Sequence, residues 1–285
     1  MTHLRQQMID AMHQRGFSVR THQSYLAAVR DLARYFHQPP DQIVPAQIQQ
    51  YFDYLVKERH LSGASCRLYL NGLRFLYCQV LSWEEFDVPI HYPKKVLKIP
   101  ELLTRDEVKR IIDACFNRKH RMMLMVCYGC GLRVSELVTI KVHHIDGERH
   151  LLRVEQGKGA KDRMVVISPA LLNYLREYWC LYRPNEWFFP NNRNSKQHLC
   201  QTTIQKVFKL TKNKVSIEKI GGIHSLRHAY ATHQLENGLP VNELQRQLGH
   251  KDLHSTLHYV HWVPNYQQGK VAYSDLVGQL EVGYE

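Results

Sequence analysis

Residues 151–167, LLRVEQGKGAKDRMVVI, contain the pattern in this chain that predicts β-structure. Two short apolar runs, 151–155 and 163–167, flank a loop that contains two glycines. Runs of this kind on either side of a glycine-containing loop predict a β-hairpin. On both sides of it, apolar residues recur at helical spacing. We therefore expect an α+β fold that is mainly α-helical with a small antiparallel sheet.

The segments next to the hairpin indicate helices. Upstream, Thr104 to Glu107 has the form of a capping box, and Val108, Ile111 and Ile112 follow at helical spacing. Further helices are expected at 121–128, from about 134, and at about 169–183, 202–213, 224–237, 241–248 and 255–262.

The first 90 residues predict a separate, all-helical domain. Ser18 can cap one helix, Pro45 can occupy the first turn of another that ends near Glu58, and a further helix is expected from Ser65 to about Val80. The inward-facing residues of the first and last of these are expected to be Tyr25, Val29, Leu32, Phe36, Leu68, Leu73, Leu76 and Val80.

A basic segment separates this domain from the rest. Residues 91–100, HYPKKVLKIP, contain two prolines, three lysines and no acidic residue, so the segment should be extended. We therefore expect a domain at 1–90, a linker at 91–101 and a second domain at 102–285.

The charge of the chain predicts a polyanionic partner. The 285 residues carry a net charge of +12, of which +3 belongs to residues 1–101 and +9 to residues 102–285. Nucleic acid is the usual partner of such a chain. Residues 193–219 contain seven cations and one acid, as expected of a surface that faces phosphates. Other candidate DNA contacts, from the helical domain, the linker and the hairpin loop, are Arg20, Arg30, Arg34, Arg67, Arg74, Lys94, Lys95, Lys98 and Lys161.

The cysteines and the apolar runs argue against a disulfide-bonded secreted protein and against a membrane protein. The seven cysteines are odd in number and mostly lie in apolar runs, so we expect buried thiols in a reducing compartment, including Cys127 and Cys130 of the one C-x-x-C. No apolar run is as long as a membrane span, and residues 1–10 are too polar for a signal peptide. We expect a cytoplasmic, nucleoid-associated protein with no membrane partner.

Several short motifs carry residue types suited to chemistry on a phosphodiester. Two arginine forks can hold the charge on its nonbridging oxygens. A tyrosine nucleophile, whose ordinary pKa is about 10, needs cationic surroundings and a base. A lysine between glycines can reach the leaving oxygen with a proton. The candidates are Arg133 in GCGLRVSEL, Lys158 in GKGAKDR, His224 and Arg227 in HSLRH, His250 in LGH, and Tyr259 in LHYVH.

The order and spacing of these motifs resemble the tyrosine recombinase family, also called the lambda integrase-like or phage integrase family. The resemblance covers nearly the whole chain and implies a helical core-binding (SAM-like) domain, a basic linker and a catalytic domain. It implies a site-specific recombinase that breaks and rejoins DNA through a 3′-phosphotyrosine, with no metal ion, cofactor or ATP. It also implies a tetramer on its DNA recombination sites.

The resemblance also assigns roles to residues. It implies that Arg133, Arg227 and His250 contact the scissile phosphate, Lys158 (or, as second candidate, Lys161) protonates the leaving oxygen, His224 helps to deprotonate the tyrosine, and Tyr259 attacks. His228 is expected to pack or to support its neighbours. The tail, with Val271, Leu276, Val277 and Leu280, is expected to dock on a neighbouring protomer, with packing on its own domain as the alternative.

Within the family, the N-terminal half is similar to integron integrases in SVRTHQSYL and LTRDEV. The stretch from Trp187 to His224 is too short for the additional basic helical segment of those enzymes, so a mobile-element or Xer-like recombinase is the expectation.

Three other interpretations remain open. A type IB topoisomerase-like enzyme would share the phosphotyrosine chemistry but would only relax DNA. A metalloenzyme could use the histidine pairs His224/His228 or His254/His258, which have metal-compatible spacing, although HExxH is absent. A non-catalytic DNA-binding protein would bind DNA without forming a covalent adduct.

Overall fold

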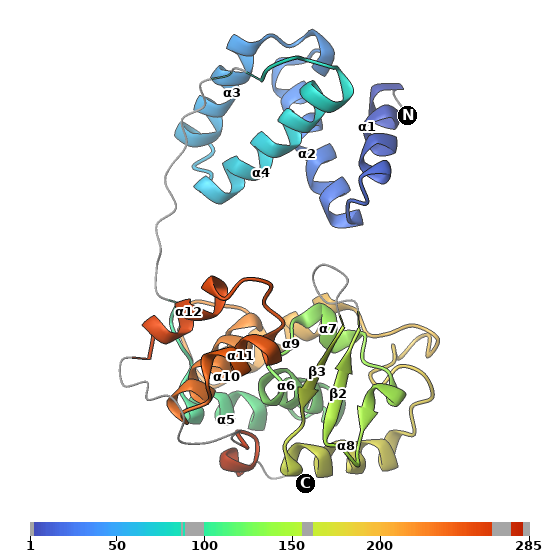
Figure 1. Cartoon of the computed structure of the whole chain (residues 1–285), viewed down its shortest axis with the longest axis vertical. Helices are drawn as coiled ribbons and strands as arrows, with labels where there is room; N and C mark the ends of the chain where they lie inside the picture. Colours follow the sequence, from blue (N-terminus) through green and yellow to red (C-terminus); the bar gives the residue numbers. More distant parts are fainter. Residues whose placement is uncertain (1–2, 87, 89–99, 156–161, 264–274, 282–285) are drawn as a thin grey trace. The chain divides into compact units, whose positions relative to one another are not determined.

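The structure, a computed structural model, describes residues 3–86, 88, 100–155, 162–263 and 275–281 (Figure 1). The chain folds into two compact units, Met1–Lys98 and Ile99–Glu285, and each has its own hydrophobic core. Most elements are helices, and the strands form one antiparallel sheet. The predicted fold class is therefore confirmed. Most of the expected linker at 91–101 lies outside the described residues.

The N-terminal unit is all helical. Ser18 caps its second helix by accepting the backbone N–H of Thr21, as expected. The side chain of Leu68, predicted to face inward, is exposed; Cys66 occupies the buried position on that turn instead. The helices are α1 (His3–Gln14), α2 (Val19–Phe36), η1 (Pro40–Gln42), α3 (Pro45–Lys57) and α4 (Gly63–Arg74), with α4 continuing into the π-helical segment η2 (Phe75–Val80).

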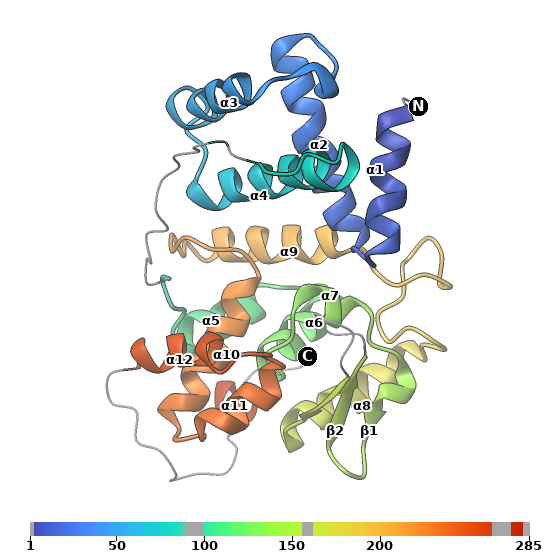
Figure 2. The same cartoon turned by 45° about the horizontal axis from the view of Figure 1, so that its top comes forward.

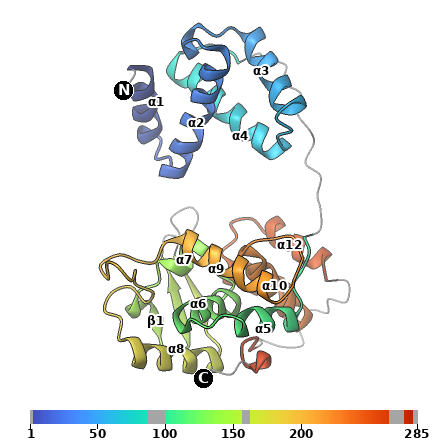
Figure 3. The same cartoon turned by 180° about the vertical axis from the view of Figure 1, so that it is seen from behind.

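The second unit is built around a helix whose last eight residues are all buried. Helix α6 (Arg118–Gly129) is buried from Met122 to Gly129 and lies between α5 (Arg105–Asp113) and the sheet (Figures 1 and 3). The expected hairpin is present as β2 (Leu151–Val154) and β3 (Arg163–Val166), with Leu152 opposite Val165. A short strand that the sequence did not predict, β1 (Ile145–Asp146), pairs with β2.

Four of the remaining helices fall on two sides of this unit. Figure 2 shows α10, α11 and α12 together on one side, and α8 with the sheet on the other. The bounds of these elements are α7 (Val134–Val138), η3 (Val142–His144), α8 (Pro169–Tyr182), α9 (Gln201–Lys214), α10 (His224–Glu236), α11 (Val241–Leu248), α12 (His254–His261) and η4 (Gly278–Leu280).

The described part of the C-terminal tail packs on its own domain. Leu276, Val277 and Leu280 are buried in the core of the second unit. The backbone N–H of Ala170 donates to Asp275 at 3.3 Å, which fastens the tail to the start of α8. In this single chain the tail therefore adopts the alternative to docking on a neighbour; Val271 lies outside the described residues.

Four of the seven cysteines are buried, as predicted: Cys66, Cys115, Cys127 and Cys130. Burial raises the pKa of the Cys127 and Cys130 thiols to about 12, which suits inert core residues. Cys180 and Cys200 are exposed, so the prediction of burial is wrong for these two residues. No helix in the described ranges combines the length and the apolar character that crossing a bilayer requires.

Candidate active site

Five of the six predicted catalytic residues meet in the second unit. Arg133 is the N-cap residue of α7, His224 and Arg227 lie in the first turn of α10, His250 follows α11, and Tyr259 lies on α12. The sixth, Lys158, and its alternative Lys161 lie outside the described residues.

Two glycines allow the backbone to present these residues. Gly131, two residues before Arg133, has φ +59°, and a Cβ there would lie 2.4 Å from the ring of Tyr230. Gly249 ends α11 with φ +64° and directly precedes His250; a Cβ there would lie 2.7 Å from Cδ of Arg163. Only glycine fits both the conformation and the space.

A buried carboxylate, Glu136, organises the arginines. Arg163 of β3 donates to both of its oxygens, at 2.9 and 2.8 Å, and the guanidinium of Arg133 donates at 2.7 Å. Arg227 Nη1 lies 3.9 Å from Oε2 of Glu136. Burial alone would raise the pKa of Glu136, but the hydrogen bonds and charges of Arg163 and Arg133 prevail and lower it to about 2. Three guanidiniums therefore face one carboxylate, and their excess positive charge suits a phosphodiester.

Arg227 is the most deeply placed of these cations. Its side chain is 1% exposed and donates to the carbonyl oxygens of Gly131 at 2.6 Å and Leu248 at 2.7 Å. Arg133 also reaches Leu248 O, at 3.5 Å, so the two guanidiniums are neighbours. Burial is the main cause that lowers the pKa of Arg227, to about 10, and the group stays charged at neutral pH. The arrangement provides the pair of forks that the sequence predicted.

His250 is held in one tautomer by its neighbours. Arg227 Nη2 lies 3.1 Å from its Nε2, which must accept because a guanidinium only donates. Nδ1 then carries the proton and donates to Thr256 Oγ1 at 2.9 Å. Burial, followed by the nearby arginines, lowers the pKa of His250 to about 4. The imidazole is therefore neutral and lies parallel to the ring of Tyr259, with 6.2 Å between the ring centroids.

His228 contacts the tyrosine hydroxyl, and Arg227 is a second hydrogen-bond partner of Tyr259. Nδ1 of His228 lies 3.0 Å from the hydroxyl oxygen of Tyr259. Burial is the main cause that lowers the pKa of His228 to about 4, so the imidazole is neutral and can accept the phenolic proton. Burial raises the pKa of Tyr259, whereas Arg227 and Arg133 act in the opposite direction. The sequence signal for His228 was its place four residues after His224 and one after Arg227.

His224 lies at the solvent side of this group. Its side chain is exposed, and its ring is 4.6 Å from that of His228. Local desolvation and the charges of Arg227 and Arg133 lower its pKa. It borders a cavity of about 510 Å³ that Arg133, Gln205 and Lys209 also line. A substrate phosphate in this hollow would reach His224 and Arg133 together.

Some of the predicted DNA-contacting residues are exposed, and others make contacts within the fold. The side chains of the five candidate arginines of the N-terminal unit are exposed, and Arg30 pairs with Asp31 at 3.3 Å. Two of the seven cations in 193–219 are engaged within the fold rather than directed outward: Lys212 is buried and donates to Lys219 O, and Lys219 pairs with Glu107 at 2.6 Å. Lys94, Lys95 and Lys98 lie outside the described residues.

Comparison with known proteins identifies the family that the chain matches and its relatives. The chain matches the phage integrase family over residues 101–265 and the SAM-like N-terminal domain of phage integrases over residues 4–85. A Sinorhizobium fredii protein named as an integrase/recombinase is 39% identical over 93% of this chain and 86% of its own length. A tyrosine recombinase of Thermosipho africanus is 32% identical over 87% of this chain and 91% of its own length.

Solved structures agree in fold. The crystal structure of the XerA recombinase is 27% identical, with a TM-score of 0.53 over 90% of this chain and 92% of that one. A lambda integrase tetramer bound to a Holliday junction is 19% identical, with a TM-score of 0.73 over 88% of this chain and 74% of that one. On the family match and these relatives, the chain belongs to the phage integrase family and is a tyrosine recombinase.

Proposed function

We propose that this recombinase breaks and rejoins DNA strands at specific sites through a covalent 3′-phosphotyrosine at Tyr259. The observation that carries the proposal is the hydroxyl of Tyr259, which lies 3.0 Å from a neutral imidazole and beside two arginine forks. In the reaction, the tyrosine oxygen bonds to phosphorus as the bond from phosphorus to the 5′-oxygen breaks. The phosphotyrosine retains the energy of the broken phosphodiester, so rejoining needs no ATP.

The scissile phosphate would be held by Arg133, Arg227 and His250. Excess positive charge around Glu136 would take the place of a metal ion in stabilising the transition state. Arg227 Nη2 lies within hydrogen-bond distance of His250 Nε2, so a nonbridging oxygen placed there would accept from Arg227, and from His250 once its proton has moved from Nδ1 to Nε2. Cleavage should therefore proceed in EDTA.

The proton of the nucleophile would pass to His228. The sequence resemblance gave this role to His224, whereas the 3.0 Å contact favours His228 Nδ1 as the acceptor. His224, exposed at the edge of the hollow, would then contact the phosphate or the adjacent backbone.

The leaving 5′-oxygen would receive its proton from Lys158, in the loop between β2 and β3. Sulfur at this position needs no proton, so Lys158→Ala should be slow on ordinary DNA and largely rescued on a 5′-thio substrate. Equal defects on both substrates would instead favour Lys161 or a role in phosphate binding.

The partners would be double-stranded recombination sites and three further copies of the chain. A relative of the same fold, lambda integrase, has been solved as a tetramer on a Holliday junction. The N-terminal unit would grip the DNA through Arg20, Arg30, Arg34, Arg67 and Arg74, and the basic segment at 91–101 would follow the backbone. Location at the nucleoid would follow from this binding.

Two DNAs with different labels test the proposal against DNA relaxation alone. Each carries the sequence that flanks the gene, and the reaction contains EDTA and no ATP. Joined molecules that carry both labels are expected. Relaxation of supercoils without joined molecules would favour the topoisomerase-like alternative, and a strict requirement for Mg²⁺ would refute the proposed chemistry.

A further inference from the structure

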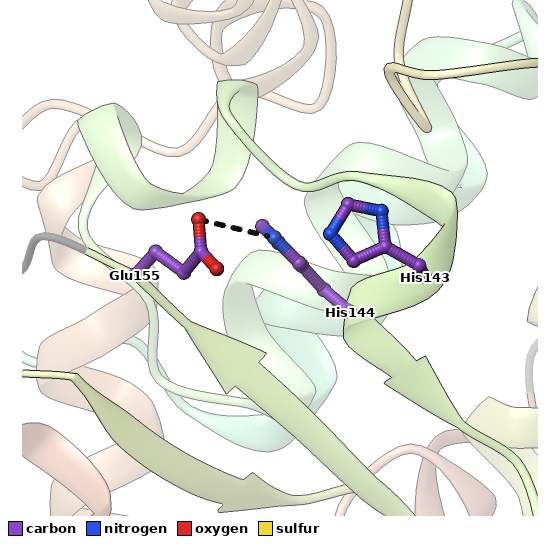
Figure 4. A group of neighbouring side chains, drawn as sticks. All are labelled: His143, His144 and Glu155. Atoms are coloured by element: carbon purple, nitrogen blue, oxygen red, sulfur yellow. Dashed lines mark ion pairs between the residues drawn. The ribbon is translucent and has the colours of Figure 1, made fainter.

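Three side chains able to bind a metal ion meet at one end of the β1–β2 pair. His143 and His144 belong to η3, the turn that leads into β1, and Glu155 follows the last residue of β2. Their ligand atoms all lie within 4.8 Å of one another, the one group of three His, Cys, Asp or Glu residues so placed in the described part of the chain. Figure 4 shows the two imidazoles side by side, with the carboxylate of Glu155 turned toward His144.

The buried imidazole of His144 has one nitrogen left for a ligand. Its side chain is nine-tenths or more buried, at 4% exposure for the residue. Nδ1 accepts the backbone N–H of Lys141 at 3.2 Å, so the proton or a metal ion must be on Nε2. Nε2 is buried without a hydrogen-bond partner, and its nearest acidic oxygen is Oε2 of Glu155 at 3.4 Å. Nε2 therefore has a carboxylate beside it but no hydrogen bond, and a metal ion bound between the two would satisfy both groups.

The cations near this cluster are already neutralised. Lys141 pairs with Glu186 at 3.0 Å, and Arg153 pairs with Asp162 at 2.9 Å. Arg153 also lies 3.4 Å from Oε1 of Glu155, which leaves Oε2 on the side of His144. The local charge therefore does not oppose a divalent cation.

We propose that His143, His144 and Glu155 bind a divalent transition-metal ion of the zinc class. Two imidazoles and one carboxylate form a ligand set that zinc commonly takes, with a fourth position for water. Bond lengths of about 2.0–2.2 Å place the ligand atoms of a tetrahedral site about 3.3–3.6 Å apart, so the cluster must close by about 1 Å. His143 is exposed and can supply this movement. His144 and Glu155 border a hollow of about 590 Å³, which gives the ion access to water.

The ion has a structural consequence distinct from strand cleavage. It would join η3 to the end of β2, three residues before Lys158 in the sequence. Arg133 lines the same hollow, but the ion contacts none of the residues assigned to phosphate or proton transfer. Metal binding and strand cleavage can therefore be tested independently of each other.

Cobalt binding to the metal-free full-length chain tests the proposal. Co²⁺ is titrated while its visible absorption bands are recorded, and Zn²⁺ is then added to displace it. The exposed ligand is removed in His143→Ala, and the carboxylate is neutralised in Glu155→Gln. Neither variant changes the buried His144, whose Nδ1 accepts the backbone N–H of Lys141. The matched control is His254→Ala with His258→Ala, a histidine pair whose rings lie 4.7 Å apart at another site.

The wild-type chain should show one cobalt ion bound with four- or five-coordinate bands that zinc abolishes. Each of the two single variants should weaken that binding at least about tenfold, because even changes outside the ligand shell cause losses of this size. The control should bind like the wild type. Wild-type cobalt affinity in both single variants, or a loss confined to the control, would overturn the proposal.

Discussion

The N-terminal unit has a core of apolar and aromatic side chains, and His22 is the buried polar residue among those described there. The catalytic unit instead encloses Arg227 and Glu136 within its packed helices. Burying charge costs free energy unless partners repay it, so a fold retains such groups where they are used. In the proposed mechanism, the charge that would bind the phosphate is built into the core of one unit, and the arginines proposed to contact DNA lie on the surface of the other.

The largest expected effect comes from removing the deepest charge. Arg227→Ala should lower cleavage of a nicked substrate by at least about 10³-fold, because a preorganised stabiliser of the transition state is lost. Arg118→Ala, an exposed arginine at the start of α6, is the matched control and should cleave normally. Single-turnover cleavage measures both. If the two variants behaved alike, the distinction between buried and surface charge would fail.

The next effect concerns the two histidines of α10. His228→Ala should slow single-turnover cleavage by about 10²-fold through loss of the proton acceptor, and His224→Ala by less. Because the pKa of His228 is about 4, its neutral form persists as the pH falls below 6.5, and cleavage should keep its histidine-dependent component down to about pH 5. A pH profile of single-turnover cleavage checks this. A larger defect in His224→Ala would return the base role to that residue.

Glu136→Gln tests how the buried charge is tolerated. Loss of the countercharge to three guanidiniums should lower the free energy of unfolding by about 3 kcal/mol near neutral pH. The folded-state pKa of about 2 lies below the ordinary 4.5, so the carboxylate stabilises the fold above pH 4.5, and this contribution is lost as the pH falls toward 2. Denaturant unfolding at several pH values measures it. A variant as stable as the wild type would show that Glu136 does not balance the arginines.

The smallest effect is expected on the surface of the N-terminal unit. Arg20→Ala should weaken DNA binding only a few-fold, with a shallower dependence on salt and no change in unfolding. Binding isotherms at several salt concentrations check this. An unchanged salt dependence would remove Arg20 from the DNA-contacting surface.

The sequence predicted most elements because their signals are local. The capping box at Thr104 and the cap at Ser18 are present as expected, and so is the hairpin. Strand β1 has two residues and depends on pairing with β2, so no periodicity could reveal it. Leu68 was misassigned because an apolar residue at helical spacing can still face solvent when the helix packs along a neighbouring stripe.

The sequence predicted which residues form the site better than it predicted the contacts between them. Arg133, His224, Arg227, His250 and Tyr259 meet as the motifs suggested. The partners of these residues depend on tertiary contacts: Arg163 lies 27 residues from Glu136, and His228 lies 31 residues from Tyr259. Hydrogen bonds across such separations leave no spacing in the sequence. His228 was expected to pack or to support its neighbours, and its 3.0 Å contact with the hydroxyl of Tyr259 could not be foreseen from spacing.

The most direct test of the account is capture of the covalent intermediate. The wild-type chain is incubated in EDTA with a nicked substrate whose cleaved strand cannot be rejoined, and the adduct is digested and sequenced by mass spectrometry. We expect a DNA-linked peptide that contains Tyr259, and no adduct from Tyr259→Phe, which should still bind DNA. An adduct that persists in Tyr259→Phe, or one that maps to any other tyrosine, would contradict this assignment.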